Sequence, residues 1–181
     1  AKAYLKSELR FLGIDTATLR QEARRWHSAH ATWGLDQLCG LAEALWRRNV
    51  FELRSFALVL LVSRADEFEP RHLPLLERLL RDSHTWALVD EIAPRLVGPL
   101  LERHPRVVGR VVDRWARDPD FWIRRAAVLA LLLPMRRGEG DWPRFERYAD
   151  PLLADREFFI RKAIGWTLRE AATRTPELVV A

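Results

Sequence analysis

The sequence predicts an all-α fold built from repeated helix pairs, and three observations support this prediction. Apolar residues recur at spacings of three and four, as in Leu38, Leu41 and Leu45, which is the periodicity of an amphipathic helix. No segment of any length shows the strict alternation of a half-buried strand. A pattern of aspartate, aromatic residue, arginine and alanine also returns along the chain. We therefore expect helices of about 10 to 20 residues joined by short turns.

Prolines and glycines mark the expected ends of these helices. A capping residue followed by proline predicts a helix start, because proline fits the first helical turn. Such pairs are Asp118-Pro119, Asp150-Pro151 and Thr175-Pro176. Breaks between helices are expected near Gly13, Gly34, Glu69-Pro70, Pro94, His104-Pro105 and residues 137–140.

The internal repeat indicates the kind of helical array. The stretch that starts at Asp118 matches the one that starts at Asp155 in its Asp, Phe, Ile, Arg, Ala and final Leu. Fainter copies begin at Phe51 and Asp82. Periods of about 35 to 40 residues are typical of TPR, HEAT and armadillo arrays, and the TPR signature is absent here. The pattern resembles the second helix of a HEAT-like pair, so we predict a curved solenoid whose inner helices line a groove.

Much of this repeated pattern has a purely structural interpretation. The repeated aspartate is expected to cap a helix, and the aromatic and leucine positions are expected to pack between layers. On this interpretation Arg54, Arg124 and Arg161 form a ladder with neighbouring aspartates.

Composition limits the possible functions. The 181 residues suit a single domain or continuous array, so we expect one domain over 1–181, trimmed at both ends. The net charge is +5, and almost all basic residues are arginines, which bind phosphate through two parallel hydrogen bonds. This composition permits a polyanionic partner, although a plain bias towards arginine explains it equally well. The single cysteine, Cys39, suits a reducing cytosol and excludes a disulfide framework.

Several functional classes have no support in the sequence. No run of about 18 apolar residues predicts a membrane span, and no segment resembles a signal peptide. There is no metal-ligand cluster, no phosphate-binding glycine loop and no serine–histidine–acid arrangement. We therefore expect no membrane association, no metal and no cofactor.

Asp90 departs from the repeat, because the stronger copies have a small alanine at its position. A carboxylate buried there without a partner would be costly to keep ionised. We therefore expect this helix to face an opening. A spacing of four puts Trp86 and Asp90 on one helix face. The alternative is a surface aspartate beside a core tryptophan.

A second departure is Trp166, which replaces a leucine on a helix that also carries Lys162 and Arg169. The preceding Gly165 costs helix stability, which indicates a close backbone approach. Arg125 and its repeat counterpart Lys162 are expected at the edge of the buried stripe, where they are candidates for phosphate contacts. The alternatives are a core tryptophan and a solvated helix edge.

Four segments resemble motifs of the AlkD-like DNA alkylation repair family, the HEAT-like repeat DNA glycosylases. They begin at Tyr4, His84, Trp122 and Phe158 and read YLKSELRFLGI, HTWALVDEIAP, WIRRAAVL and FFIRKAIGWTLRE. The matches extend from Tyr4 to Pro176 in the order of the family.

The resemblance implies a basic, C-shaped groove for duplex DNA and hydrolysis of the N-glycosidic bond of cationic lesions such as N3-alkyladenine and N7-alkylguanine. It places the catalytic tryptophan and aspartate of the family on Trp86 and Asp90. The second tryptophan falls on Trp166 and the phosphate-contacting arginine on Arg125. Tyr4 matches an aromatic residue beside the same cleft.

The resemblance therefore implies a monomeric glycosylase that acts on alkylated double-stranded DNA, with Lys162, Arg161 and Arg169 gripping phosphates. In this mechanism the two indoles stabilise positive charge through cation–π contacts and Asp90 stabilises the oxocarbenium-like sugar. We expect a bacterial, cytoplasmic protein associated with the nucleoid through DNA. Two other functions are open: a non-catalytic HEAT-like module that binds DNA structures, and a protein-interaction scaffold.

Overall fold

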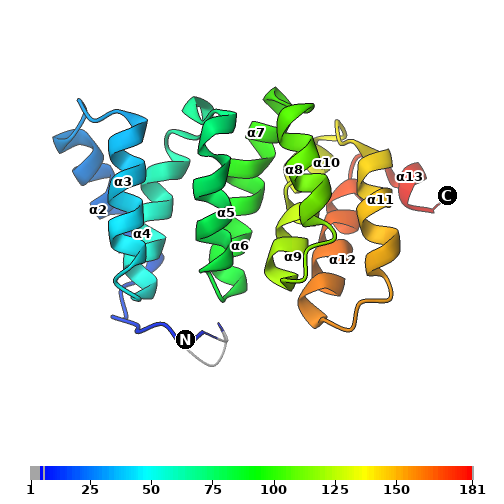
Figure 1. The fold of residues 1–181 in the computed structure, drawn as a ribbon, viewed down its shortest axis with the longest axis horizontal. Coiled ribbons are helices and arrows are strands. Elements are labelled where there is room, and N and C mark those ends of the chain that lie inside the picture. Colours follow the sequence, from blue (N-terminus) through cyan, green and yellow to red (C-terminus); the bar gives the residue numbers. More distant parts are fainter. Residues whose placement is uncertain (1–4, 6, 181) are drawn as a thin grey trace.

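The computed structural model describes residue 5 and residues 7–180 as a two-layered array of helices (Figure 1). The α-helices are α2 (Thr16–Ala29), α3 (Leu35–Trp46), α4 (Phe51–Val62), α5 (Leu73–Arg81), α6 (Trp86–Ile92), α7 (Gly98–Arg103), α8 (Val107–Trp115), α9 (Phe121–Leu129), α10 (Leu132–Arg137), α11 (Trp142–Leu152), α12 (Phe158–Ala172) and α13 (Pro176–Val180). Two short 3₁₀ turns, η1 (Ala65–Glu67) and η2 (Pro70–His72), precede α5, and a π-helical turn, η3 (Ala93–Val97), joins α6 to α7. Among the described helices, none is long and apolar enough to span a membrane.

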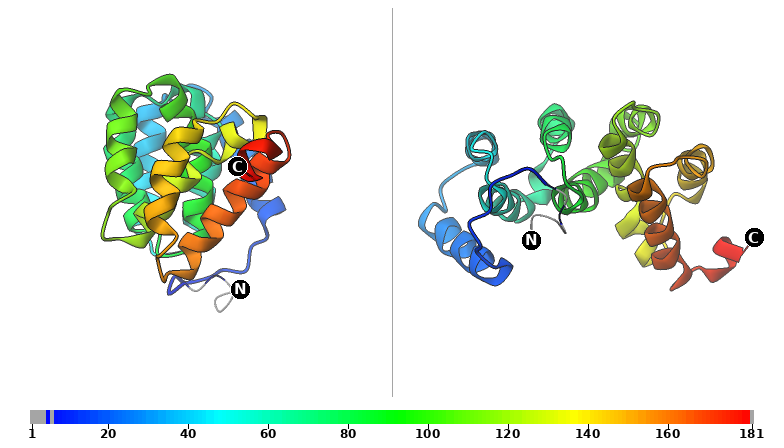
Figure 2. Two further views of the ribbon diagram at one scale, coloured as in Figure 1. Left: turned by 90° about the vertical axis from the view of Figure 1, so that its right-hand side faces the viewer. Right: turned by 90° about the horizontal axis from the view of Figure 1, so that it is seen from below.

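The helices alternate between an outer and an inner layer. Helices α3, α5, α8 and α11 form the outer layer, and α4, α6, α9 and α12 form the inner one (Figure 2). The array curves, so that α2 and α12 turn towards the same side at its two ends (Figure 2). The predicted all-α helical-repeat fold is confirmed. All four copies of the sequence repeat lead into inner helices, as predicted for the second helix of each pair.

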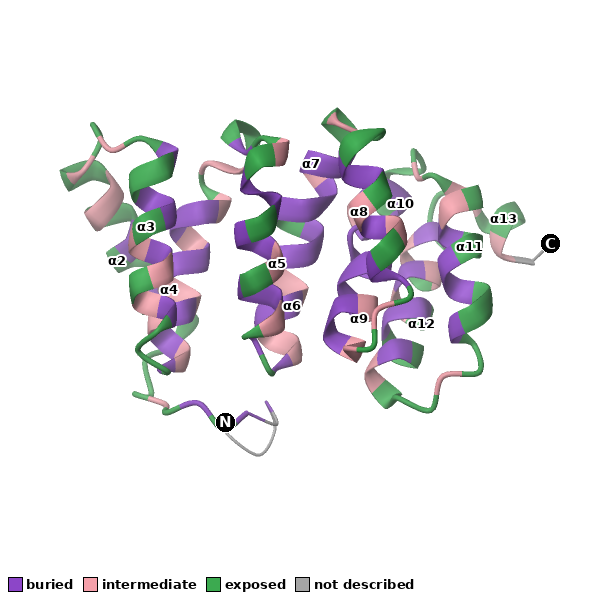
Figure 3. Cartoon of the chain, in the orientation of Figure 1, coloured by how far each residue is buried: buried purple, intermediate pink, exposed green. Residues whose placement is uncertain are grey.

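The apolar stripes of both layers meet in one continuous core. Trp115 of α8 and Ile123 of α9 are fully buried, as is Leu96 in the π-helical turn. Figure 3 shows buried residues on the facing sides of the two layers and exposed residues on their outer sides. Truncating a core leucine or isoleucine to alanine costs about 2 to 5 kcal/mol, so this packing holds the inner helices rigidly in place.

The repeated aspartates have a different role from the predicted one. Asp120, not Asp118, caps α9 by accepting the N–H of Trp122. Asp118 accepts the N–H of Asp120 at 2.9 Å and so forms the turn before the helix. The cap prediction is therefore wrong for Asp118, because the chain needs two further residues to turn into the inner layer.

The predicted ladder between arginines and aspartate side chains forms at Arg124, whereas Arg54 bonds the backbone of an aspartate and Arg161 forms no ion pair among the described residues. Arg124 pairs with Asp155 of the next repeat at 2.9 Å, and Arg54 donates to the backbone carbonyl of Asp82. These bonds join successive helix pairs at one edge of the array. At Arg54 and Arg124 these contacts give the repeated arginine a structural role.

Two prolines differ from the sequence-based expectation. Pro151 was expected to start a helix but lies in the last turn of α11, where it removes one backbone donor and the helix ends one residue later. Pro94 was expected to separate two helices, but the chain stays helical from Trp86 to Arg103. The wider π-helical turn accommodates the proline ring and its missing N–H. The predicted start at Pro176 is confirmed.

The segment before α2 is pinned along one edge of the inner layer. The carboxylate of Glu52, buried in α4, accepts the N–H groups of Leu12 and Gly13 at 2.9 Å each. Further along, the hydroxyl of Thr85 donates to the carbonyl of Leu5 at 2.8 Å. The segment thus reaches from α4 to the start of α6, next to Trp86.

Candidate catalytic cleft on the inner face

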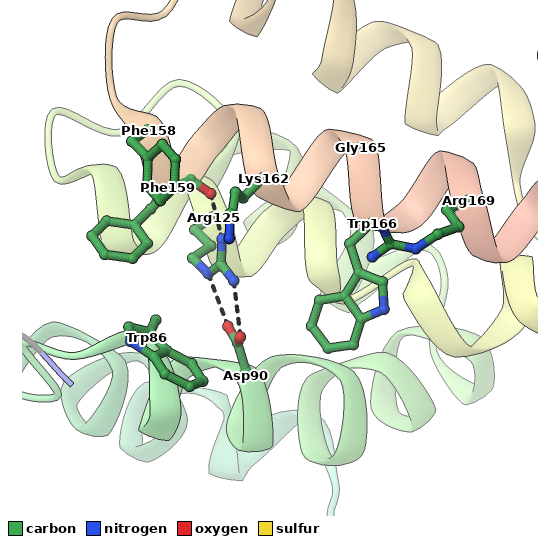
Figure 4. Close-up of a pocket in the computed structure, with 9 residues that line it drawn as sticks. All are labelled: Trp86, Asp90, Arg125, Phe158, Phe159, Lys162, Gly165, Trp166 and Arg169. Atoms are coloured by element: carbon green, nitrogen blue, oxygen red, sulfur yellow. Dashed lines mark hydrogen bonds and ion pairs between the residues drawn. The ribbon is translucent and has the colours of Figure 1, made fainter. Parts of the chain in front are cut away.

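A cleft of about 500 Å³ opens on the inner layer between α6, α9 and α12 (Figure 4). Its lining residues are Trp86, Asp90, Arg125, Phe158, Phe159, Lys162, Gly165, Trp166 and Arg169. Three of the four copies of the repeat therefore contribute to a single site.

Helix α6 presents Trp86 and Asp90 to the cleft because its other face belongs to the core. Leu88, Val89 and Ile92 are buried against the outer layer. Trp86 and Asp90 lie one turn apart on the remaining face. The expectation that this helix faces an opening agrees with the position of both residues in the cleft lining.

Asp90 forms a two-point ion pair with Arg125 of α9. The Nε and Nη2 atoms of Arg125 donate to the two carboxylate oxygens at 2.8 Å each. The side chain of Asp90 is only 14% exposed, and that of Arg125 only 5%. Burial raises the pKa of Asp90 above its ordinary value, and the hydrogen bonds from Arg125 offset only part of this effect. The carboxylate therefore has a neighbouring cation that favours its charged form and little water around it.

Arg125 lies deeper than the sequence predicted. Its third nitrogen, Nη1, donates to the backbone carbonyl of Phe159 at the start of α12, so one side chain joins three successive inner helices (Figure 4). The expected position at the solvated edge of the buried stripe is wrong, because these partners hold the guanidinium inside. A phosphate contact by Arg125 stays a prediction, and it would use the two N–H groups that these bonds leave over.

Trp166 is held by a chain of hydrogen bonds along α12. Its indole Nε1 donates to Glu170 Oε1 at 3.0 Å, and the other oxygen of Glu170 accepts from Arg136 Nε at 2.7 Å. The bond from Arg136 lowers the pKa of Glu170, which keeps the acceptor charged. In the view of Figure 4, Asp90 lies between the indoles of Trp86 and Trp166.

The remaining predicted site residues divide into three groups. Lys162 and Arg169 line the cleft, and the Lys162 Nζ lies 5.0 Å from the centre of the Phe158 ring. Arg161 is exposed on the same helix but does not line this cleft. Tyr4 lies outside the described residues.

A second cleft, of about 760 Å³, continues along the inner face towards α2. Trp86, Asp90 and Trp166 line both clefts, so the two form one surface. The second cleft also contains Arg20 and Arg24 of α2, which the sequence analysis did not identify. They directly follow the buried Leu19 and Ala23. Two arginines four residues apart beside a buried stripe were the available signal.

Charge pairing differs between the clefts and the outer layer. On outer helices, Arg78 pairs with Glu43 and Arg114 pairs with Glu77. Among the described residues, no ion pair forms at four cations that line the clefts. These cations are Arg20, Arg24, Lys162 and Arg169. Unpaired cations at both ends of a concave surface are suited to a polyanion, whose binding depends on such charges.

The fold and this site define a helical-repeat protein with a carboxylate, two indoles and, on the same inner face, cations that form no ion pair with the described residues. A family model described as "DNA alkylation repair enzyme" matches residues 1–181. The chain belongs to this family, which confirms the family suggested by the sequence motifs. Membership also indicates an enzyme of DNA alkylation repair, with DNA as its partner.

Solved structures show the same fold at low sequence identity. A predicted DNA alkylation repair enzyme from Enterococcus faecalis superimposes with a TM-score of 0.86 at 23% identity, covering 99% of this chain and 83% of that one. AlkD2 from Streptococcus mutans gives a TM-score of 0.67 at 17% identity, covering 98% of this chain and 84% of that one. A comparison with curated proteins found no match.

Proposed function

We propose that the chain is a DNA glycosylase that releases cationic alkylated bases, such as N3-alkyladenine and N7-alkylguanine, from duplex DNA. The observation that supports this most strongly is the position of Asp90 in one cleft with Trp86 and Trp166. The three side chains bring two electron-rich rings and one carboxylate into the cleft. All three can stabilise the positive charge of the base and of the sugar during the reaction.

The positive charge of the alkylated base makes the N-glycosidic bond easier to break. An alkylated base of this kind already carries a positive charge, so it leaves with the electrons of the C1′–N bond as a neutral molecule. The sugar becomes an oxocarbenium ion, a water adds to C1′, and the proton of that water passes to solvent. No general acid is required to protonate the base before it leaves.

Trp86 and Trp166 would bind the positive base and sugar through their ring faces. Such cation–π contacts are worth about 0.5 to 2 kcal/mol each, and the larger values belong to desolvated sites. The hydrogen bond from Trp166 to Glu170 fixes the direction of that ring, so less motion has to be lost when DNA binds.

Asp90 would stabilise the positive charge that develops at C1′ and orient the attacking water. Its carboxylate is fixed by Arg125, and a preorganised charge needs no reorganisation during bond cleavage. Glycoside hydrolases use carboxylates against the same kind of transition state. Lys162 and Arg169 would hold phosphates beside the cleft, with Arg161 and Arg125 as further candidates.

The substitution Asp90→Asn tests this assignment. Asparagine keeps the shape of the side chain and loses its charge, so we expect release of 7-methylguanine from methylated duplex to fall by about 100-fold or more, as for other preorganised charges. Duplex affinity should stay within a few-fold of the parent protein. Asp66→Asn is the matched control, because the side chain of Asp66 is 100% exposed.

The same experiment separates the alternatives. Full activity of Asp90→Asn would remove Asp90 from the mechanism. Salt-dependent DNA binding by the parent protein without any base release would favour a non-catalytic DNA-binding module. Thermal melting of each variant shows whether lost activity reflects lost folding, because the substitution also weakens the pair with Arg125.

A further inference from the structure

Gly165 lies in the middle of α12, on the face that lines the cleft. It is exposed, and a Cβ atom added there would meet nothing within 4 Å. The close backbone approach expected from the sequence is therefore wrong, because no other segment of the described chain comes within 4 Å of this position. The space above Gly165 is therefore open to a ligand.

The glycine weakens its own helix without any compensating contact in the protein. Glycine in a helix interior costs about 1 kcal/mol relative to alanine. Gly40 in α3 provides a direct comparison, because it is also helical, exposed and free of neighbours within 4 Å. Helix α3 belongs to the outer layer (Figure 2), and Gly40 lines neither cleft, so the two positions differ mainly in what they face.

The neighbours of Gly165 indicate what occupies this space. Lys162 lies one turn before it and Arg169 one turn after it on the same helix face, and among the described residues neither forms an ion pair. The two residues are separated by about 10 Å along the helix axis. Two cations that lack an ion pair, one on each side of a bare stretch of helix, match a chain of phosphates, which carries charge at regular intervals.

We propose that Gly165 is the point at which the sugar–phosphate backbone of one DNA strand crosses α12. The missing side chain lets the strand approach closely enough for Lys162 and Arg169 to contact phosphates on both sides of it. Gly165 thereby sets the depth at which the strand enters the cleft next to Trp166. This inference rests on the proposed function, because it takes duplex DNA as the ligand of the cleft.

The test compares Gly165→Leu with Gly40→Leu in binding to unmodified duplex DNA over a range of salt concentrations. Both variants replace a helical glycine with a good helix former, so both should melt about 2 to 4 °C higher than the parent protein. Gly40→Leu should bind DNA like the parent. Gly165→Leu should bind more weakly and show a salt dependence, log K against log[salt], shallower by about 2, the loss of two phosphate contacts.

The slope is the decisive reading, because Gly165→Leu removes no charge. Lys162→Met removes one charge and should lower the slope by about 1. An unchanged slope and affinity in Gly165→Leu would overturn the proposal, and so would a lower melting temperature, which would indicate a packing role.

Release of 7-methylguanine by the parent protein is measured in parallel. If the parent releases bases while Gly165→Leu binds normally, this inference alone fails. If the parent neither binds DNA nor releases bases, the proposed function fails with it.

Discussion

The ion pair between Asp90 and Arg125 allows a quantitative prediction for the stability of the site. Replacing Arg125 with methionine keeps only the apolar stem of the side chain and leaves Asp90 buried without its cation. Removing one partner of a buried pair costs about 3 to 5 kcal/mol, and the lower value applies here because Asp90 is still 14% exposed. For a chain of this size we expect a melting temperature about 6 to 12 °C lower.

The loss should depend on pH, and its sign follows from the pKa of Asp90. Burial already raises this pKa in the folded parent protein, and without Arg125 nothing would oppose burial and the nearby charge of Glu91, which both raise it. A carboxyl group whose pKa is higher in the folded than in the unfolded state favours folding while it is protonated. This contribution to the free energy of unfolding is complete below the unfolded-state pKa, about 3.9, and is lost as the pH rises through the folded-state pKa. The difference in stability between Arg125→Met and the parent should therefore be larger at pH 7 than at pH 5.

Urea unfolding followed by far-UV circular dichroism at both pH values measures this difference. Arg78→Met is the control, because Arg78 pairs with Glu43 on the exposed outer surface and such pairs contribute about 0 to 1 kcal/mol. The double variant Asp90→Asn with Arg125→Met should recover much of the loss. A difference below about 1 kcal/mol at pH 7, or one that does not change with pH, would refute the reasoning.

Three further predictions concern single side chains. Gly98→Ala should lower the free energy of unfolding by about 1 to 3 kcal/mol, because its Cβ would lie 2.8 Å from the carbonyl oxygen of Ala130; unchanged urea unfolding would contradict this. Burial raises the pKa of Cys39 to about 11, so the thiol should react with a disulfide reagent at pH 8 only after unfolding, and rapid reaction in the native state would be the opposite result. Glu170→Ala should lower release of 7-methylguanine by about 2- to 30-fold, the loss of one cation–π contact, by freeing the ring of Trp166. Glu170→Gln keeps an acceptor and should retain most activity; equal losses in both would exclude a role for the hydrogen bond to Trp166.

The sequence was sufficient to predict the architecture, because the repeat occupies the inner helix of every pair. The repeated alanines Ala126 and Ala163 are fully buried, and burial is what hydrophobic periodicity reports. The aromatic positions vary more, because Trp122 is buried whereas Phe158 is 48% exposed. The positions at which helices begin and end were less predictable. Pro94 and Pro151 lie inside helices, because a proline is tolerated where a turn widens or a helix is about to end, and neither condition is visible in the sequence.

Site residues were predictable where they depart from the repeat, and less predictable where contacts with other helices determine their position. Asp90, Trp86 and Trp166 line one cleft, as their departures from the repeat and the family motifs suggested. The burial of Arg125 was not predictable, because its partners Asp90 and Phe159 lie on other helices. Arg20 and Arg24 were missed because α2 lies outside the repeat and reaches the inner face only through the curvature of the array.

A glycosylase is recognised by its product, the free base, and this product can be identified in a single experiment. The parent protein is incubated with duplex DNA that contains N-methylated purines, and the released bases are identified by chromatography and mass spectrometry. We expect free 7-methylguanine and 3-methyladenine from the parent protein, almost none from Asp90→Asn, and no uracil from a duplex that contains this neutral base. Release of uracil at a comparable rate, or no release of any methylated purine by a folded, DNA-binding protein, would contradict the proposed function.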